Sequence, residues 1–342
     1  MTPPSLPALA WSAVGTADGD AVVRDALACV GAFAVTGAPV DPGLLARTRA
    51  ALARFFALPL DEKRAFAVER CARGWSTLEN AREAREQLHF GPEGPERPAP
   101  HGSETLAGPN VWPDDDVRVG VTALTHACVE IARALFDVVE RASSTAPGTL
   151  AGLVARDPYV ITKAIRTRAS GDGVATGEGE RAGVAPHCDL TLLTIAPSTV
   201  GSARDDAGGL ECLDVDGAWR AAPADATIVI AGEVLSALTR GRVRAAAHRV
   251  VAAGERLSIP VFVSPSLDAV VTPAGAPGAR AADATHVHRA LDDDLDAPFV
   301  FGDAERRRKI GGRWCAFCAR PAEPPRSVGA PRAPRSAPRQ SR

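Results

Sequence analysis

The second half of the chain changes the spacing of its apolar residues, and this change limits the folds that are open to it. From about Pro158 onward, apolar and polar residues alternate with a period of two, in short runs that turn residues separate. Such alternation is typical of β-strands that bury one face. The runs are YVITKAIR, DLTLLTIA, LECLDV, TIVIAG, HRVVAA and LSIPVFVSP. Several short strands at this spacing predict a β-sandwich or jelly roll.

The first half is mostly helical by the same criterion. Apolar residues recur at steps of three and four, as on one face of a helix, in segments 20–30, 41–58 and 114–142. The middle segment opens with Asp41 as the expected N-cap and Pro42 at the first helical position. The predicted fold class is therefore mostly β with flanking α-helices.

The chain of 342 residues divides into three predicted regions. Residues 1–150 form a helical N-terminal region, and residues 151–320 form the β core. Residues 321–342 are rich in proline and arginine and cannot bury a core, so we expect a disordered tail.

Composition excludes several classes of partner. The formal net charge of −2 argues against nucleic acid and anionic membranes. No uninterrupted apolar stretch reaches about 18 residues, so we expect no transmembrane helix, and the start lacks the features of a signal peptide. The seven scattered cysteines indicate reduced thiols and a cytoplasmic protein. We interpret Cys315 and Cys318, a C-x-x-C pair, as buried small residues rather than a zinc or redox site.

One strand-like run begins with residues that the interior of a strand does not favour. In AGVAPHCDLTLLTIAP, His187 and Asp189 stand two positions apart at the head of an apolar run. Residues i and i+2 of a strand point to the same side, so we expect the two side chains to project together. His248, which begins the run HRVV, is the candidate third ligand. Two imidazoles and one carboxylate on one face of an octahedral ion suit non-haem Fe(II).

A second pair with the same spacing follows. Arg256 and Ser258, in ERLSIP, are also two positions apart on a predicted strand. A guanidinium beside a hydroxyl can hold a carboxylate through several hydrogen bonds, and a dicarboxylate co-substrate would supply one.

These motifs, in this order, resemble the isopenicillin N synthase-like group of iron- and 2-oxoglutarate-dependent dioxygenases. The resemblance rests on PHCDLTLLTI, HRVV and ERLSIPVFVSP, and on VGAFAVTGAPV, FFALPLDEKRAF and GPNVWP in the first half. It covers roughly residues 20 to 320.

The resemblance implies a distorted double-stranded β-helix. It implies Fe(II) held by His187, Asp189 and His248, and 2-oxoglutarate held by Arg256 and Ser258. The expected reaction is hydroxylation or another oxidation of a small molecule by O₂, with release of succinate and CO₂ and with ascorbate as a supporting reductant. Residues 1–150 would then be the N-terminal region of such a dioxygenase. We expect the protein to be a monomer and to bind neither nucleic acid nor a membrane.

The chain departs from the group at one position beside the site. Many members place a tyrosine on the strand before the His-x-Asp, where this chain has Thr167. This leaves open an oxidase that uses no 2-oxoglutarate, or an enzyme that fragments 2-oxoglutarate to ethylene. The alternative that is not an enzyme is a metal-free binding module built on the same β-barrel.

The sequence offers a few candidate residues for the substrate pocket. His89, Phe90, Asn110 and Trp112 lie where the group commonly lines or supports its pocket, although Trp112 is equally explained by core packing. Arg166 and Arg168 either reach an anionic substrate or lie in solvent. We interpret His126 as structural and His286 and His288 as parts of an exposed loop.

Overall fold

The computed structural model of the chain describes residues 4–68, 73–79, 84–94, 106–167, 182–198, 209–251, 255–275 and 297–310. Several predictions lie outside these residues and stay predictions. They concern Arg168, the pair His286 and His288, the pair Cys315 and Cys318, and the tail 321–342.

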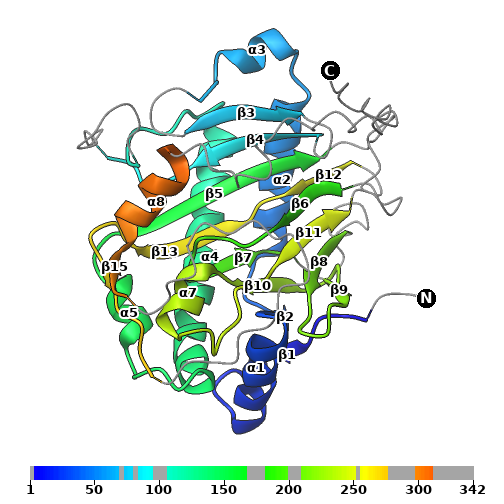
Figure 1. Cartoon of the computed structure of the whole chain (residues 1–342). Helices are drawn as coiled ribbons and strands as arrows, with labels where there is room; N and C mark the ends of the chain where they lie inside the picture. Colours follow the sequence, from blue (N-terminus) through cyan, green and yellow to red (C-terminus); the bar gives the residue numbers. More distant parts are fainter. Residues whose placement is uncertain are drawn as a thin grey trace, which may run out of the picture.

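Nine strands form a main sheet through the middle of the molecule (Figure 1). Their order is β1-β2-β10-β7-β13-β5-β4-β3, and β12 also pairs with β5. All neighbouring pairs are antiparallel except β1 with β2. The strands are β1 (Ala8–Ala10), β2 (Ala32–Thr36), β3 (Gly74–Glu79), β4 (Ala84–Phe90), β5 (Pro158–Thr167), β7 (Leu193–Ala196), β10 (Thr227–Ala231), β12 (Arg256–Ser258) and β13 (Val261–Ser266).

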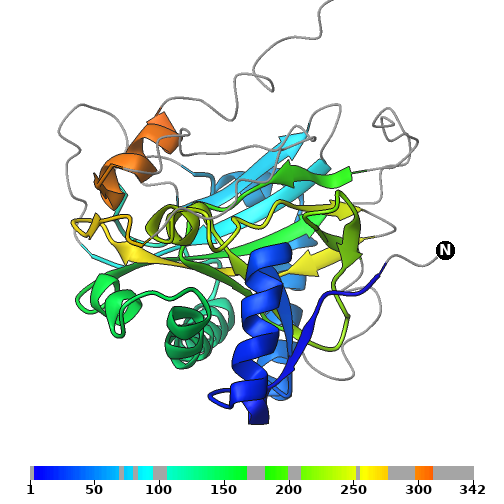
Figure 2. The same cartoon turned by 60° about the horizontal axis from the view of Figure 1, so that its bottom comes forward.

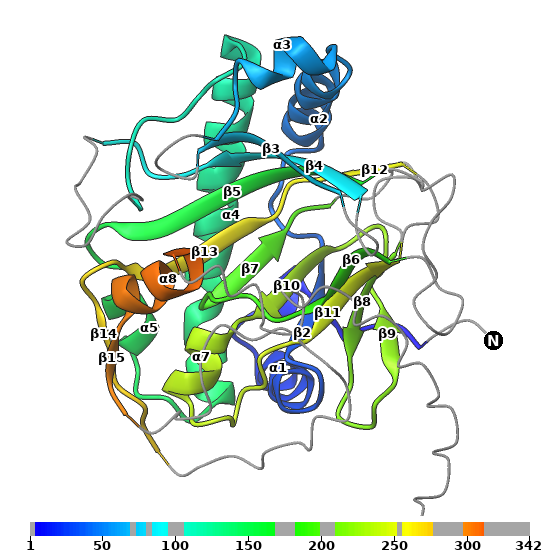
Figure 3. The same cartoon turned by 45° about the horizontal axis from the view of Figure 1, so that its top comes forward.

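A smaller antiparallel sheet faces the main sheet, in the order β6-β11-β8-β9 (Figure 3). Its strands are β6 (Ala182–His187), β8 (Leu210–Leu213), β9 (Trp219–Ala221) and β11 (His248–Val251). Ile228 and Ile230 of the main sheet share one buried apolar cluster with Val184, Leu210 and Val250 of the smaller sheet. Two antiparallel sheets that close over a shared core form the predicted jelly roll.

The helices lie against the main sheet, and the three long segments of the first half are helical as predicted. They are α1 (Ala17–Cys29), α2 (Pro42–Phe56) and α4 (Asp115–Ala142). Asp41 Oδ1 accepts the N–H of Gly43, and Asp114 Oδ1 accepts the N–H of Val117, both at 2.8 Å. These side chains cap α2 and α4, because the first N–H groups of a helix have no partner inside it.

Shorter elements complete the fold. They are a 3₁₀ turn (Trp11–Ala13), α3 (Leu60–Arg64), α5 (Thr149–Leu153), α7 (Glu233–Leu238), α8 (Phe301–Ile310), β14 (Val270–Val271) and β15 (Phe299–Val300). Helices α4 and α8 lie on opposite sides of the main sheet (Figure 2). We call the face toward the small sheet the inner face, and the face that α2 and α4 cover the outer face.

Helix α4 is long and apolar enough to span a membrane by length and composition. In the fold, however, it packs against α1, α2, β7 and β13. Its buried side chains include Val121, Leu124, Cys128, Ile131 and Leu135, the face that the sequence pattern predicts. The core of the protein therefore accounts for its apolar face.

Strands β3 and β4 are not predicted by the sequence pattern. They pair from Gly74 with His89 to Glu79 with Ala84, and β4 extends the main sheet beyond β5. Strands from the first 150 residues thus belong to the same sheet as the β core. The division into regions at residue 150 remains a prediction.

A buried ion pair links β4 to helix α3. Lys63 Nζ of α3 lies 2.6 Å from Glu86 Oε2 of β4, and each side chain is only 5% exposed. Trp75 Nε1 donates to the same oxygen at 3.2 Å, and Lys63 Nζ donates to the carbonyl of Phe56 at 3.2 Å. Both charges are therefore compensated inside the protein, as buried charges require.

We expect Glu86→Gln to lower the free energy of unfolding by about 3 kcal/mol, because it leaves the buried Lys63 ammonium without its counter-charge. Urea unfolding monitored by circular dichroism measures the change. The control is Asp61→Asn, which removes the partner of Arg64 in an exposed pair of 2.7 Å. That variant should lose less than about 1 kcal/mol. Equal effects of the two variants would contradict the role of the buried pair.

Candidate metal centre

Two histidines meet across neighbouring strands of the small sheet. His187 is the last residue of β6, His248 is the first residue of β11, and the two are direct partners in the antiparallel register. Their ring centroids are 4.2 Å apart. His248 is buried and His187 is partly exposed. Two residues 61 positions apart in sequence are thus brought together by one strand pair.

Asp189 joins the histidines from a turn and not from the strand. Strand β6 ends at His187, and residues 188–192 form an irregular connection to β7. The prediction that His187 and Asp189 share one strand is therefore wrong, because β6 ends before Asp189. The two side chains still meet, but the connection after the strand brings them together. The turn has its own supports: Thr194 Oγ1 donates to Asp189 Oδ2 at 2.7 Å, and the N–H of Glu233 donates to the Asp189 carbonyl at 2.8 Å.

Backbone carbonyls fix the orientation of both imidazole rings. Nδ1 of His187 lies 2.9 Å from the Ala185 carbonyl, and Nδ1 of His248 lies 3.0 Å from the Ala246 carbonyl. A carbonyl only accepts, so each Nδ1 carries the hydrogen, and each Nε2 presents its lone pair. His187 Nε2 is 3.5 Å from Asp189 Oδ1, and His248 Nε2 is 3.7 Å from Asp189 Oδ2.

The charge states also suit a metal ligand set. Burial alone would raise the pKa of Asp189, but His248, His187 and the Thr194 hydroxyl together hold it below its ordinary value. Burial and the neighbouring His187 lower the pKa of His248 to about 4. At neutral pH the site therefore offers a carboxylate and a neutral imidazole, the forms that bind metals.

The donor set fits a divalent transition metal. One ligand atom each from His187, Asp189 and His248 lies within 4.8 Å of the other two. Cys212 is the other direct partner of His248, but burial, Asp189 and Glu211 raise the pKa of its thiol to about 12. The metal-binding group found among the described residues contains no cysteine, so Cys212 does not close the site as a thiolate would in structural zinc. Three protein donors leave the remaining coordination positions for small molecules.

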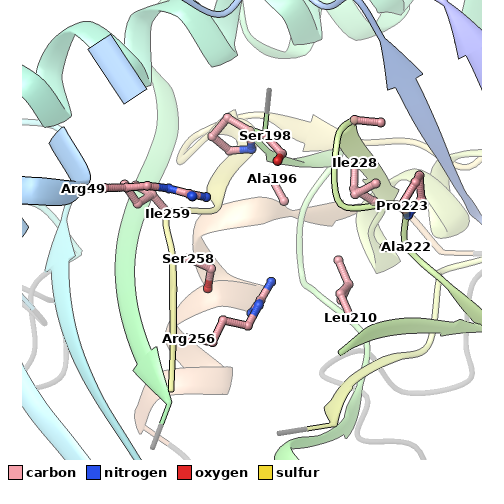
Figure 4. A pocket seen from close by; sticks show the side chains of 12 residues that line it. Arg49, Ala196, Ser198, Leu210, Ala222, Pro223, Ile228, Arg256, Ser258 and Ile259 are labelled. Carbon is pink, nitrogen blue, oxygen red and sulfur yellow. The ribbon is translucent and has the colours of Figure 1, made fainter. Parts of the chain in front are cut away.

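A cavity lies between the sheets and contains the second predicted pair. Arg256 and Ser258 project into it from β12, as their spacing predicts, and Leu210 of the small sheet faces them (Figure 4). Most of the remaining lining is apolar and includes Ala196 and Ile228 of the main sheet and Ala222 and Pro223 after β9. A guanidinium and a hydroxyl on an apolar wall can hold one end of a dicarboxylate.

Thr167 is the direct partner of Arg256 across β5 and β12. Its hydroxyl lies 3.5 Å from the Arg256 carbonyl. Thr167 therefore supports the backbone of Arg256 at this position.

The structure separates the remaining candidates. Arg166 lies on the outer face, where it donates to Glu255 and to the carbonyl of Phe56 at 2.8 and 2.7 Å, so it does not face the site. Phe90 and Trp112 stack at 4.5 Å in a cleft beside α4, again on the outer side. Asn110 lines the same cleft.

Of the remaining substrate candidates that the structure describes, His89 lies on the inner face, since it pairs with Lys163 of β5. His126 is an exposed residue of α4 and belongs to no site.

Two residues beside the site are not predicted by the sequence. Thr194 holds Asp189, but a threonine in an apolar strand carries no distinctive signal. Arg49 of α2 also lines the cavity and reaches it from the helical layer (Figure 4). On a helix rich in arginine and alanine it is indistinguishable from a solvated residue.

Comparison with known proteins agrees with this site. Residues 15–115 match the family described as non-haem dioxygenase in morphine synthesis N-terminal, and residues 173–265 match the 2OG-Fe(II) oxygenase superfamily. Kihadalactone A synthase LFS of Citrus sinensis is 26% identical over 275 residues, which are 73% of this chain and 78% of that protein. Gibberellin 20 oxidase 2 of Oryza sativa subsp. indica is 43% identical over 95 residues, 27% of this chain and 23% of that protein.

Solved structures share the fold. A full-length protein of Neurospora crassa, solved in complex with alpha-KG and 5-formyluracil, superposes with a TM-score of 0.69 at 16% identity, over 90% of this chain and 96% of that chain. The first family model covers α1, α2, β3 and β4, and the second covers the whole small sheet and the three converging donors. The chain therefore belongs to the isopenicillin N synthase-like family of Fe(II)- and 2-oxoglutarate-dependent oxygenases.

Proposed function

We propose that the protein hydroxylates or otherwise oxidises a small organic metabolite, with His187, Asp189 and His248 as the ligands of Fe(II). The observation that supports these ligands is the convergence of their three donor atoms within 4.8 Å. When bound, Fe(II) supplies O₂ activation with electrons from 2-oxoglutarate, which leaves as succinate and CO₂.

Arg256 and Ser258 are proposed to hold the distal carboxylate of 2-oxoglutarate. Leu210, which faces them across the cavity, lies two residues from Cys212, the direct partner of His248. Two residues of a strand span about 7 Å, so this wall of the cavity begins only that far along β8 from the partner of His248. The cavity also favours 2-oxoglutarate dependence over an oxidase without it, because a guanidinium that faces an apolar wall is suited to an anion.

The chain's own residues prepare this site. The Ala185 and Ala246 carbonyls keep both Nε2 atoms turned to the metal position, and Thr194 keeps Asp189 in place. Such supports hold metal ligands in position before the metal binds. The apolar cavity wall limits the access of water to the co-substrate.

The substrate is proposed to be a small molecule, as the names of the relatives indicate for those proteins. We further propose a cytoplasmic monomer that binds neither nucleic acid nor membrane. The net charge of −2 supports the former exclusion. Among the described residues, Cys29, Cys128, Cys188 and Cys212 form no disulfide, which supports a reducing compartment.

We expect His187→Ala to abolish succinate release, because it removes one of three metal donors. The assay measures succinate and CO₂ with Fe(II), O₂ and 2-oxoglutarate, together with bound iron. The control is His126→Ala, which removes an exposed imidazole from α4 and should retain full activity. Normal turnover by the His187 variant would refute the metal assignment.

Thr194→Val should weaken Fe(II) binding about ten- to a hundredfold, since it removes the hydroxyl that orients Asp189. Anaerobic equilibrium dialysis measures the affinity. Thr162→Val is the matched control, because Thr162 is a buried threonine whose hydroxyl lies 2.6 Å from that of Thr125 on the outer face. If both variants bind iron as the natural protein does, Thr194 has no part in the site.

Arg256→Gln should raise the KM for 2-oxoglutarate about ten- to a hundredfold, the effect of losing hydrogen bonds between charged groups. Anaerobic titration followed by the weak visible charge-transfer band should show the same shift in affinity. Arg249→Gln is the control, since Arg249 pairs with Glu211 at 2.8 Å on β8. An unchanged KM in the Arg256 variant would remove this residue from the co-substrate site.

A further inference from the structure

The connection between β6 and β7 carries a second threonine beside the one that holds Asp189. Thr191 lies in this connection, and its side chain is buried, as are those of Thr194 and Asp189. Oγ1 of Thr191 lies 3.3 Å from Oγ1 of Thr194, which in turn lies 2.7 Å from Asp189 Oδ2. Three buried polar groups thus form a chain of hydrogen bonds that ends on a metal ligand.

The carboxylate at its end sets the direction of this chain. An ionised carboxylate only accepts hydrogen bonds, so the single hydrogen of the Thr194 hydroxyl points to Asp189. Toward Thr191 the same oxygen can then only accept, and the Thr191 hydroxyl is the donor. Within the part of the chain that the structure describes, the Thr191 hydroxyl has no other hydrogen-bond partner. Thr194 therefore receives its hydrogen.

The hydrogen of Thr191 restricts the rotation of the Thr194 hydroxyl. A threonine hydroxyl turns about its C–O bond to suit its surroundings. A donor at the oxygen of Thr194 favours the orientation in which the hydrogen of Thr194 faces Asp189 and not Thr191. Hydrogen bonds in such a chain also polarise one another, so the bond to the carboxylate becomes stronger.

The start of helix α7 fixes the position of Thr191. Gly232, the residue before α7, lies so close that a Cβ on it would stand 2.3 Å from Thr191 Oγ1 and 2.4 Å from the Thr191 carbonyl oxygen. The N–H of Gly232 donates to the Leu192 carbonyl at 3.2 Å, and the N–H of Glu233 donates to the Asp189 carbonyl at 2.8 Å. The close approach requires glycine at 232, and it holds both ends of the segment 189–192 against α7.

We propose that Thr191 is a positioning residue of the metal centre, whose hydroxyl holds that of Thr194 against Asp189 and so keeps this carboxylate in place for Fe(II). The proposal rests on the proposed function, because it concerns the Fe(II) site. It accounts for a polar side chain in a connection whose neighbouring residues, Leu190 and Leu192, are buried in the large core cluster.

The test measures Fe(II) affinity by anaerobic equilibrium dialysis. Thr191→Val keeps the shape of the side chain and removes the hydroxyl, so Fe(II) should bind about three- to tenfold more weakly, the effect of one neutral hydrogen bond. Thr191→Ser keeps the hydroxyl and should retain the affinity within about twofold. The matched control is Thr162→Val, which breaks another buried hydroxyl pair, that of Thr162 with Thr125, and should leave Fe(II) affinity unchanged.

A double-mutant cycle separates this role from a general structural one. If Thr191 acts through Thr194, then Thr191→Val in a Thr194→Val background should change Fe(II) affinity by less than about twofold, because the hydroxyl that it orients is absent. The melting temperature of each metal-free variant shows whether it is folded. Should Thr191→Val not fold, Thr191→Ala is measured against Thr162→Ala in the same way.

Three results would overturn the proposal. They are an Fe(II) affinity of the Thr191→Val variant equal to that of the natural protein, an equal loss of affinity in the Thr191→Ser variant, and an undiminished effect in the Thr194→Val background. Failure of the natural protein itself to bind Fe(II) would instead contradict the proposed function, so the dialysis of the natural protein distinguishes the two failures.

Discussion

The pairing of β6 with β11 is the contact on which the metal centre depends. Its register sets His187 directly opposite His248, and the two rings meet at 4.2 Å because neighbouring strands are only about 4.8 Å apart. Asp189 follows as soon as β6 ends, and β7 returns Thr194 to support it. A slip of this register by one residue would turn one imidazole to the other side of the sheet and leave no site.

The two faces of the main sheet contact different surroundings, and this explains the composition of its strands. Its outer face meets the helices through apolar residues such as Ile195, Val229 and Val261, which belong to the large core cluster. Its inner face is mixed: Ile228 and Ile230 close the core between the sheets, whereas β4, β5 and β12 present basic and amide groups. Charge is concentrated where small molecules are to be held.

Sequence patterns predict the parts of this protein whose forces are local. The extent of α4 follows from the apolar spacing over residues 114–142, and the jelly roll follows from short alternating runs. Strand β4 does not follow, because Arg85 and Gln87 face the cavity side while Glu86 meets Lys63 on the other, so both faces are polar. The position of Arg166 on the outer face likewise depends on strand pairing, which a single sequence does not fix.

The site residues divide in the same way, into those that local sequence spacing predicts and those that depend on long-range packing. His187, Asp189, His248, Arg256 and Ser258 can be named from motif spacing, and the structure brings the first three together and the last two into one cavity. The supports of the site are long-range contacts. The hydroxyl of Thr194 and the approach of Arg49 from α2 depend on how β7 and the helical layer pack, so no local pattern reveals them.

The rigidity of the imidazole rings has a consequence for metal supply. Carbonyls hold both rings by hydrogen bonds of 2.9 and 3.0 Å, so the protein presents a finished three-donor set to any ion that arrives. Two nitrogens and a carboxylate bind cobalt, nickel and copper at least as strongly as ferrous iron, by the general order of divalent affinities. Correct loading therefore depends on which ions the cell keeps available during folding. Purification in air would oxidise Fe(II), and purification over nickel resin would offer a competing ion that binds more tightly.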